Sequence, residues 1–376
     1  MEFNDLKAQY ARLKNEIDGA ILKVLQRGDY ILGEEVRRLE SELAEYVGSK
    51  YCVTCANGTD ALSLALQTMN IGKGDAVFLP AFTFFATAET VTRAGAIPVF
   101  VDVDKDTFNL DAKKLSAAIE KVRGDGKYKP KAVVPVDLFG LPCDYDAISL
   151  IAQKYNMLVI EDGAQGFGGE YNGRKACSFG HISTTSFFPA KPLGCYGDGG
   201  ALFVDDENYY KQLLSIRFHG KGADKYDNVK LGYNSRLDTI QAAILLVKLK
   251  AFKEFELKRR IEIGVCYNEL LKDVVRTPYI PENYKSSYAQ YTITLKDSKE
   301  REKLMAHLKS EGIPSMVYYP RCMHEQTVYK NYPCIYFDLK NAKSLTESVL
   351  SLPMHPYLEN TEIIHVAESV KRGLGK

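Results

Sequence analysis

The stretch KAVVPVDLFGLPCDYDAISLIAQKYNMLVIED, residues 131–162, decides the fold class of this chain. Its first ten residues predict a strand, residues 145–156 have the apolar spacing of a helix, and residues 157–162 predict a second strand. The same alternation starts near residue 50, with predicted strands at 51–56, 76–80 and 97–104 and predicted helices at 58–69, 85–95 and 109–122. This repeated pattern is typical of an α/β fold with three layers, in which helices cover both faces of a mainly parallel sheet. Such sheets bind ligands beyond the carboxyl ends of their strands.

The second part of the chain predicts a smaller α/β domain behind a long helical connector. Residues 235–271, SRLDTIQAAILLVKLKAFKEFELKRRIEIGVCYNELL, predict one long helical stretch with a kink near Gly264. Beyond it, residues 289–295 and 314–320 (AQYTITL and PSMVYYP) predict strands, and residues 298–312 predict a helix. We therefore expect a large domain over residues 1–250 and a small domain over residues 251–376.

Composition narrows the class of protein. The 376 residues carry a net charge of +1, with 45% hydrophobic and 26% charged residues, which is ordinary for a globular protein. There is no basic run that would bind nucleic acid, no apolar run of the ~20 residues needed to span a membrane, and the first 18 residues are too charged for a secretory signal. We therefore expect a cytoplasmic protein without nucleic-acid or membrane partners.

Two of the eight cysteines form a CxxC pair, Cys52 and Cys55, inside the predicted strand YCVTCA. Three residues apart on a strand, their side chains point to opposite faces, so a shared metal is disfavoured and reduced core cysteines are expected. Cys322 and His324 could begin a metal site, but the chain has no matching second half. We expect no metal.

Three local patterns carry candidate chemistry. Lys191 lies in TTSFFPAKPLGCYGDGGAL among apolar, aromatic and small residues, Asp162 ends a buried strand, and Gly58 and Thr59 begin a helix directly after a strand. Taken singly, each has a structural alternative: a buried structural lysine, a turn or capping aspartate, and an ordinary capped turn. Taken together with the Ser186 hydroxyl, they provide a Schiff-base lysine, a partner for a protonated ring nitrogen and a phosphate seat, which describes a pyridoxal 5'-phosphate (PLP) site.

The chain resembles the DegT/DnrJ-type sugar aminotransferases, which are PLP enzymes of the aspartate-aminotransferase fold (fold type I). The stretches that carry the resemblance span nearly the whole chain and are GDYILGEEVRRLE, ANGTDAL, PAFTFFATAETV, VDLFG, VIEDGAQGFG, SFFPAKPLGCYGDGGAL, LGYNSRLDTIQAAIL and SLPMHPYL. Their order and spacing are highly specific. The last three are most similar to the 3-aminotransferases that act on UDP-2-acetamido-2-deoxy-3-oxo-D-glucuronate in lipopolysaccharide or O-antigen biosynthesis. The resemblance implies transfer of an amino group from L-glutamate to a nucleotide-linked keto sugar.

The resemblance also implies a role for each matching residue. Lys191 would bond to the cofactor and then carry the proton, Asp162 would pair with the ring nitrogen, and Gln165 would contact the ring hydroxyl. Phe84 would stack on the ring. Gly58, Thr59 and Ser186 would bind the cofactor phosphate, and Asn234 would bind the cofactor phosphate of a neighbouring subunit. The residues that would contact the substrate are Tyr30, Arg236, Tyr318, Tyr319, His324 and, more weakly, His219. Because Asn234 would reach the neighbour, the implied active unit is a homodimer with shared active sites.

Two positions depart from the family pattern. Ala190 stands where serine is frequent, and Tyr318 stands where histidine is frequent, next to an unusual RCMHEQ segment. These changes leave open a dTDP-3-keto-6-deoxyhexose or UDP-3-keto-N-acetylglucosamine as the substrate. Some relatives are sugar dehydratases or regulators. The dehydratases carry histidine in place of the lysine, so Lys191 disfavours that activity, and the chain has no evident helix-turn-helix for a DNA-binding regulator.

Overall fold

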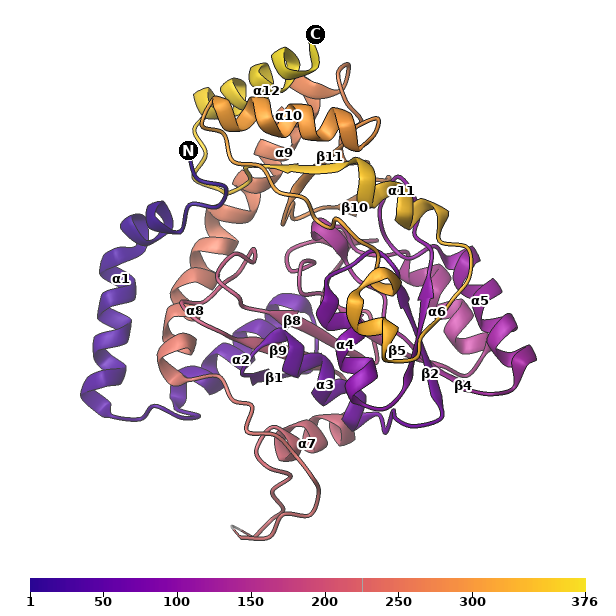
Figure 1. Ribbon diagram of the computed structural model, residues 1–376. Coiled ribbons are helices and arrows are strands. Elements are labelled where there is room, and N and C mark those ends of the chain that lie inside the picture. The colour runs from indigo at the N-terminus through magenta and orange to yellow at the C-terminus, as the bar shows by residue number, and fades with distance from the viewer. Residues whose placement is uncertain (225) are drawn as a thin grey trace.

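The computed structural model describes residues 1–224 and 226–376, and its centre is an eight-stranded sheet (Figure 1). The strand order is β1-β9-β8-β5-β4-β2-β3-β12, and neighbouring strands run parallel except where β9 lies antiparallel to β1 and β8. The strands are β1 (Tyr51–Cys55), β2 (Asp75–Pro80), β3 (Ile97–Val101), β4 (Lys129–Val133), β5 (Leu158–Asp162), β8 (Ile182–Ser186), β9 (Gly200–Val204) and β12 (Ile335–Tyr336). The prediction of a mainly parallel sheet is confirmed.

Helices cover both faces of this sheet. One face packs against α3 (Gly58–Thr68), α4 (Phe85–Arg93) and α7 (Glu207–Ile216), and the other against α2 (Glu34–Val47), α5 (Ala112–Asp125), α6 (Tyr145–Lys154) and α8 (Thr239–Ala251). Alternate residues of each strand supply the two cores, as the two-residue period of a strand requires. Cys55 packs on the α3 side and Cys52 on the α2 side, which confirms that these two thiols face opposite ways. The three-layer α/β prediction is therefore confirmed.

The predicted long helical connector consists of α8, a π-helical turn η2 (Phe252–Glu256) and α9 (Leu257–Leu271). Helix α1 (Leu6–Arg27) packs alongside α8. The predicted kink near Gly264 is wrong, because Gly264 lies inside regular α9 and the irregular turn comes earlier. Gly264 is instead a packing glycine, since a Cβ there would lie 2.6 Å from the ring of Tyr288.

The second part of the chain packs around a two-stranded antiparallel sheet of β11 (Tyr291–Thr294) and β13 (Val349–Leu352). Helices α9, α10 (Ser298–Ser310) and α12 (Asn360–Leu374) share its core. The strand predicted over residues 314–320 is wrong, since only Met316 forms a single bridge, to Ser351. The remaining elements are β6 (Glu170–Tyr171), β7 (Arg174–Lys175), β10 (Tyr284–Lys285), α11 (Lys340–Ser348), η1 (Leu138–Gly140), η3 (Met323–Glu325) and η4 (Thr327–Lys330).

The chain crosses back to the large sheet after the connector. Strand β12 pairs with β3, and buried Cys322, Met323 and Leu339 belong to the core of the large sheet. The division into residues 1–250 and 251–376 stays a prediction, and these contacts join the two parts. Among the described residues, no helix combines the length and apolar character needed to cross a membrane.

Candidate active site

Asp162 is the last residue of β5 and is almost fully buried. Its carboxylate accepts a hydrogen bond of 2.8 Å from the Thr87 hydroxyl on α4 and one of 3.2 Å from the backbone N–H of Ala164. Burial nevertheless raises the pKa of Asp162, because the two hydrogen bonds and the charge of Lys191 compensate only in part for the lost water. A buried carboxylate in this position favours a cationic ligand group.

Lys191 lies in the turn between β8 and β9, and the turn is tightly bonded. Its backbone N–H donates to the carbonyl of Phe188 at 2.9 Å, and the Cys195 N–H donates to Phe187 at 2.7 Å. Loss of solvation lowers the pKa of Lys191, and the negative charge of Asp162 opposes that effect. The predicted lysine and aspartate therefore act on each other at the end of the sheet, and the lowered pKa favours a neutral, reactive amine.

Gln165, Tyr319 and Phe84 form one wall beside Asp162. The Gln165 amide accepts from the Phe139 N–H at 2.9 Å and donates to the Tyr319 hydroxyl at 3.1 Å. The exposed ring of Phe84 lies with its centroid 6.3 Å from that of Tyr319. Tyr319 was expected to contact substrate, and in the structure its hydroxyl holds Gln165.

The start of α3 has the geometry that a phosphate seat needs. The Asn57 side chain caps α3 by accepting the Asp60 N–H at 2.7 Å. A Cβ on Gly58 would lie 2.7 Å from the Cβ of Ser186, so only glycine lets the helix start approach β8 so closely. Thr59 and Ser186 are both partly exposed there. Free N–H groups at a helix start, with hydroxyls beside them, suit a phosphate.

The cradle at α3, the buried acid at β5 and the lysine of low pKa together fit the phosphate, ring nitrogen and aldehyde of PLP. The cradle is shaped by two glycines, because a Cβ on Gly200 would also collide, 2.6 Å from the backbone of Asn57. These residues come from four segments that meet at the carboxyl ends of the strands, which is where a parallel sheet presents a ligand site.

Among the described residues, the hydrogen bonds and ring contacts of Asn234, Arg236 and Tyr30 are with residues outside this group. Asn234 is exposed and accepts a hydrogen bond from the Arg236 guanidinium, which also stacks 4.8 Å from the centroid of Phe218. The carbonyl of Tyr30 accepts the Thr239 N–H at 2.9 Å. His219, the weaker candidate, lies in the same segment, which follows α7. Within the described ranges, no contact links these residues to Lys191 of the same chain.

Tyr318 lies next to the wall beside Asp162, since its ring centroid is 5.7 Å from that of Tyr319, and His324 lies at the edge of the sheet. Tyr318 packs its ring edge-on against Phe3, with centroids 6.2 Å apart. The ring of His324 lies 4.6 Å from that of Tyr336 on β12, at the edge of the sheet. Burial lowers the pKa of His324, so the ring tends to be neutral. Among the described residues, no hydrogen bond, ion pair or ring contact joins His324 to Asp162.

Residues that the motifs did not indicate complete the site. Thr87 is one of them, because nothing in the sequence around this helical residue indicates its hydrogen bond to Asp162. A buried acid pair, Asp137 and Glu161, is another: burial raises the pKa of both carboxyl groups, and the nearby Glu161 charge raises that of Asp137 further. Glu161 accepts from the Phe179 N–H and the Ser183 hydroxyl, each at 2.7 Å. The pair thereby fixes the strand end that presents Asp162.

Comparison with known proteins agrees with this geometry. The DegT/DnrJ/EryC1/StrS aminotransferase family matches residues 11–371. The chain is 46% identical over 364 residues to the UDP-2-acetamido-2-deoxy-3-oxo-D-glucuronate aminotransferase of Pseudomonas aeruginosa, covering 96% of this chain and 97% of that one.

Two solved structures are similar over almost the whole chain. A DegT/DnrJ/EryC1/StrS aminotransferase from Brucella abortus has a TM-score of 0.97 at 49% identity, with 100% of both chains covered. A sugar aminotransferase from Streptococcus pneumoniae in its PLP form has a TM-score of 0.88 at 26% identity, with 96% of both chains covered. The chain is therefore a member of the DegT/DnrJ/EryC1/StrS aminotransferase family.

Proposed function

We propose that this protein transfers the amino group of L-glutamate to the C3 keto group of UDP-2-acetamido-2-deoxy-3-oxo-D-glucuronate. The proposal is supported by a buried Asp162 whose charge acts on Lys191, and by the glycine cradle at the start of α3. The sugar follows from the P. aeruginosa relative, whose name states it and which matches along nearly all of both chains.

PLP is the cofactor, and it supplies an electron sink for the carbon that gains or loses the amino group. Gly58, Thr59 and Ser186 would hold its phosphate, and Asp162 would keep its ring nitrogen protonated. Gln165 would contact its ring hydroxyl, and Phe84 would cover its face. These assignments rest on the arrangement described above and on the family pattern.

Lys191 would hold the cofactor aldehyde and, once displaced by an incoming amine, would take a proton from the substrate carbon and return it. A lysine in water is protonated at neutral pH and cannot act as a base. The surroundings that lower the pKa of Lys191 favour the neutral amine, which has the lone pair that proton transfer needs. Two half-reactions on one lysine predict ping-pong kinetics.

The sugar carboxylate would need a cationic partner. Arg236 is the candidate that lies in the same segment as Asn234, and Tyr30, Tyr318, Tyr319 and His324 are the other candidates for sugar contacts. We place Asn234, with Arg236 beside it, at the cofactor phosphate of a second copy of the chain, as the family pattern implies, since among the described residues no hydrogen bond, ion pair or ring contact links either side chain to Lys191. A homodimer with shared active sites would then be the active unit.

The alternative substrates remain a dTDP-3-keto-6-deoxyhexose and UDP-3-keto-N-acetylglucosamine, neither of which carries the carboxylate.

A nucleotide-sugar substrate suits an enzyme of the cytoplasm that supplies lipopolysaccharide or O-antigen assembly, and eight unpaired cysteines suit a reducing compartment.

The deciding experiment mixes purified protein with PLP and L-glutamate and offers the three keto sugars in parallel. We expect 2-oxoglutarate to form fastest with the glucuronate sugar. A preference for either neutral sugar would overturn the proposed substrate.

Lys191→Ala should abolish turnover with every sugar while circular dichroism stays unchanged, and retained transamination in that variant would overturn the role of Lys191.

A further inference from the structure

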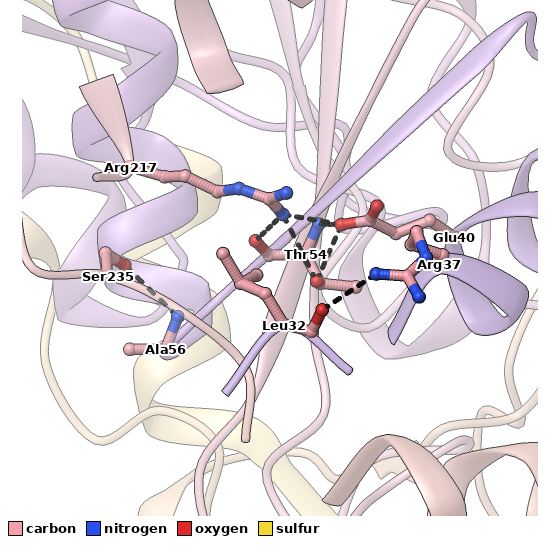
Figure 2. Close-up of polar contacts among 7 residues, drawn as sticks. All are labelled: Leu32, Arg37, Glu40, Thr54, Ala56, Arg217 and Ser235. Atoms are coloured by element: carbon pink, nitrogen blue, oxygen red, sulfur yellow. Dashed lines mark hydrogen bonds and ion pairs between the residues drawn. The ribbon is translucent and has the colours of Figure 1, made fainter. Parts of the chain in front are cut away.

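A buried ion pair surrounds Thr54 near the end of β1 (Figure 2). The guanidinium of Arg217 lies 2.5 Å from the carboxylate of Glu40, with side-chain exposures of 8% and 12%. The same Arg217 nitrogen donates to the carbonyl of Thr54 at 2.9 Å. The Glu40 carboxylate accepts the Thr54 N–H at 2.9 Å and its hydroxyl at 2.8 Å. All polar groups of Thr54 are therefore held by the pair.

The backbone of Arg217 continues this chain of contacts. Its carbonyl accepts the N–H of Ser235 at 3.0 Å. The Ser235 hydroxyl, fully buried, accepts the N–H of Ala56 at 3.1 Å (Figure 2). Thr54 and Ala56 are thus tied to the same arginine, one through its side chain and the other through its backbone.

The segments joined in this way are the two that would provide phosphate contacts in the proposed function. Ala56 leads through the capping residue Asn57 into Gly58 and Thr59, which form the seat of this subunit. Ser235 follows Asn234, which is placed at the seat of the other subunit in the proposed function. A shift of Arg217 would therefore move groups that belong to both seats.

A buried ion pair is a costly way to gain stability. Two charges lose their water, and apolar residues of similar volume are often as stabilising or more so. What the pair adds is geometry, because a planar guanidinium and a carboxylate fix their partners in direction as well as distance. If backbone donors move by a few tenths of an ångström, the site that they form binds its ligand more weakly.

We propose that Glu40 and Arg217 are positioning residues that hold the phosphate seat of the cofactor, a role that rests on the proposed function. In this role they would act through Thr54, Ala56 and Ser235 and not by direct contact with the cofactor or the substrate.

The test compares PLP with pyridoxal, which is the same ring without the phosphate, in equilibrium dialysis against full-length protein freed of cofactor. The wild type should bind PLP much more tightly than pyridoxal. Arg217→Met should weaken PLP by about tenfold, the factor for one lost charge-assisted hydrogen bond, and leave pyridoxal unchanged. Arg217→Lys should restore part of the difference.

Matched variants separate positioning from general damage. Arg301→Met removes a similar bond, from Arg301 to the carbonyl of Thr346 in the second part of the chain, and should change neither affinity. Ser235→Ala breaks only the link to Ala56 and should weaken PLP in the same selective way, and it decides the question if Arg217→Met does not fold.

Equal weakening of both ligands, or no weakening of either, would overturn the positioning role. A wild type that binds PLP no better than pyridoxal would instead overturn the phosphate seat itself, so the two failures are distinguishable.

Discussion

At the scale of single residues, the pair of Thr87 and Asp162 sets the strength of the acid that would face the cofactor ring. The Thr87 hydroxyl stabilises the ionised carboxylate, and burial works against it. Thr87→Val keeps the volume and removes the bond, so the pKa of Asp162 should rise further.

We expect kcat of Thr87→Val to fall roughly tenfold with an unchanged fold, because a more basic carboxyl is less often ionised. Stopped-flow and steady-state assays with L-glutamate measure it. Thr90→Val is the control on the same helix, since within the described chain the Thr90 hydroxyl bonds to the carbonyl of Thr87 at 3.3 Å and not to Asp162. Equal losses in both variants would contradict this role of Thr87.

At the scale of elements, the approach of α3 to β8 determines whether a phosphate fits. Gly58→Ala would place a methyl group 2.7 Å from the Cβ of Ser186, so the helix start must move away from the strand. We expect PLP affinity to fall by about tenfold or more, measured by dialysis.

The control for Gly58→Ala is Gly19→Ala inside α1, where the new methyl group meets nothing within 4 Å. This change should raise the free energy of unfolding by about 0.5–1 kcal/mol and leave PLP affinity as it was. Unchanged PLP affinity in Gly58→Ala would show that the helix start does not hold the phosphate.

At the scale of the whole molecule, Lys248 lies where α1, the lysine turn and the connector meet. Its amine is buried, has no hydrogen-bond partner within the described chain and lies 4.7 Å from the centroid of Tyr196. Burial lowers the pKa of Lys248 to about 8, although Glu256 opposes this. The folded state therefore binds this proton less well than the unfolded state, whose pKa is near 10.5.

We expect Lys248→Met to raise the free energy of unfolding by up to about 3 kcal/mol below pH 8. The gain should shrink as the pH rises from about 8 to 10.5, because the wild-type lysine then loses its proton in both states. Urea unfolding at several pH values measures it. Lys250→Met, on the exposed side of the same helix, should change little, and a pH-independent gain at position 248 would contradict this explanation.

The segment after α7 bears on assembly. Its residues 226–234 project from the body of the molecule (Figure 1). Leu231 is 89% exposed and Val229 is 59% exposed. Leu231→Lys should weaken the proposed homodimer by taking a charge into its interface, so sedimentation should shift toward monomer and activity should fall on dilution. Tyr279→Lys, 55% exposed elsewhere, is the control, and a dimer of unchanged stability would contradict this interface.

Local patterns in the sequence predicted most of the fold and the ends of the strands that carry the site. Periodicity and turn residues are local signals, so they located β5 with Asp162 and the cap of α3 correctly. They could not locate the bond from Thr87, 75 residues from Asp162, or the π-helical turn in the connector. The strand predicted at 314–320 is wrong because this segment pairs with another strand only through a single bridge, at Met316. Whether a segment finds a pairing partner depends on residues distant in the sequence, which local patterns do not reveal.

The ion pair at Thr54 has a second consequence, for the border of the sheet. Strand β1 is an outermost strand, and its free backbone groups could recruit a strand from another chain. Glu40 and Arg217 occupy those groups at Thr54, and the opposite border is β12, only two residues long. Fewer backbone groups are therefore free to pair with a ninth strand at either border, which disfavours strand-to-strand aggregation between copies of the protein.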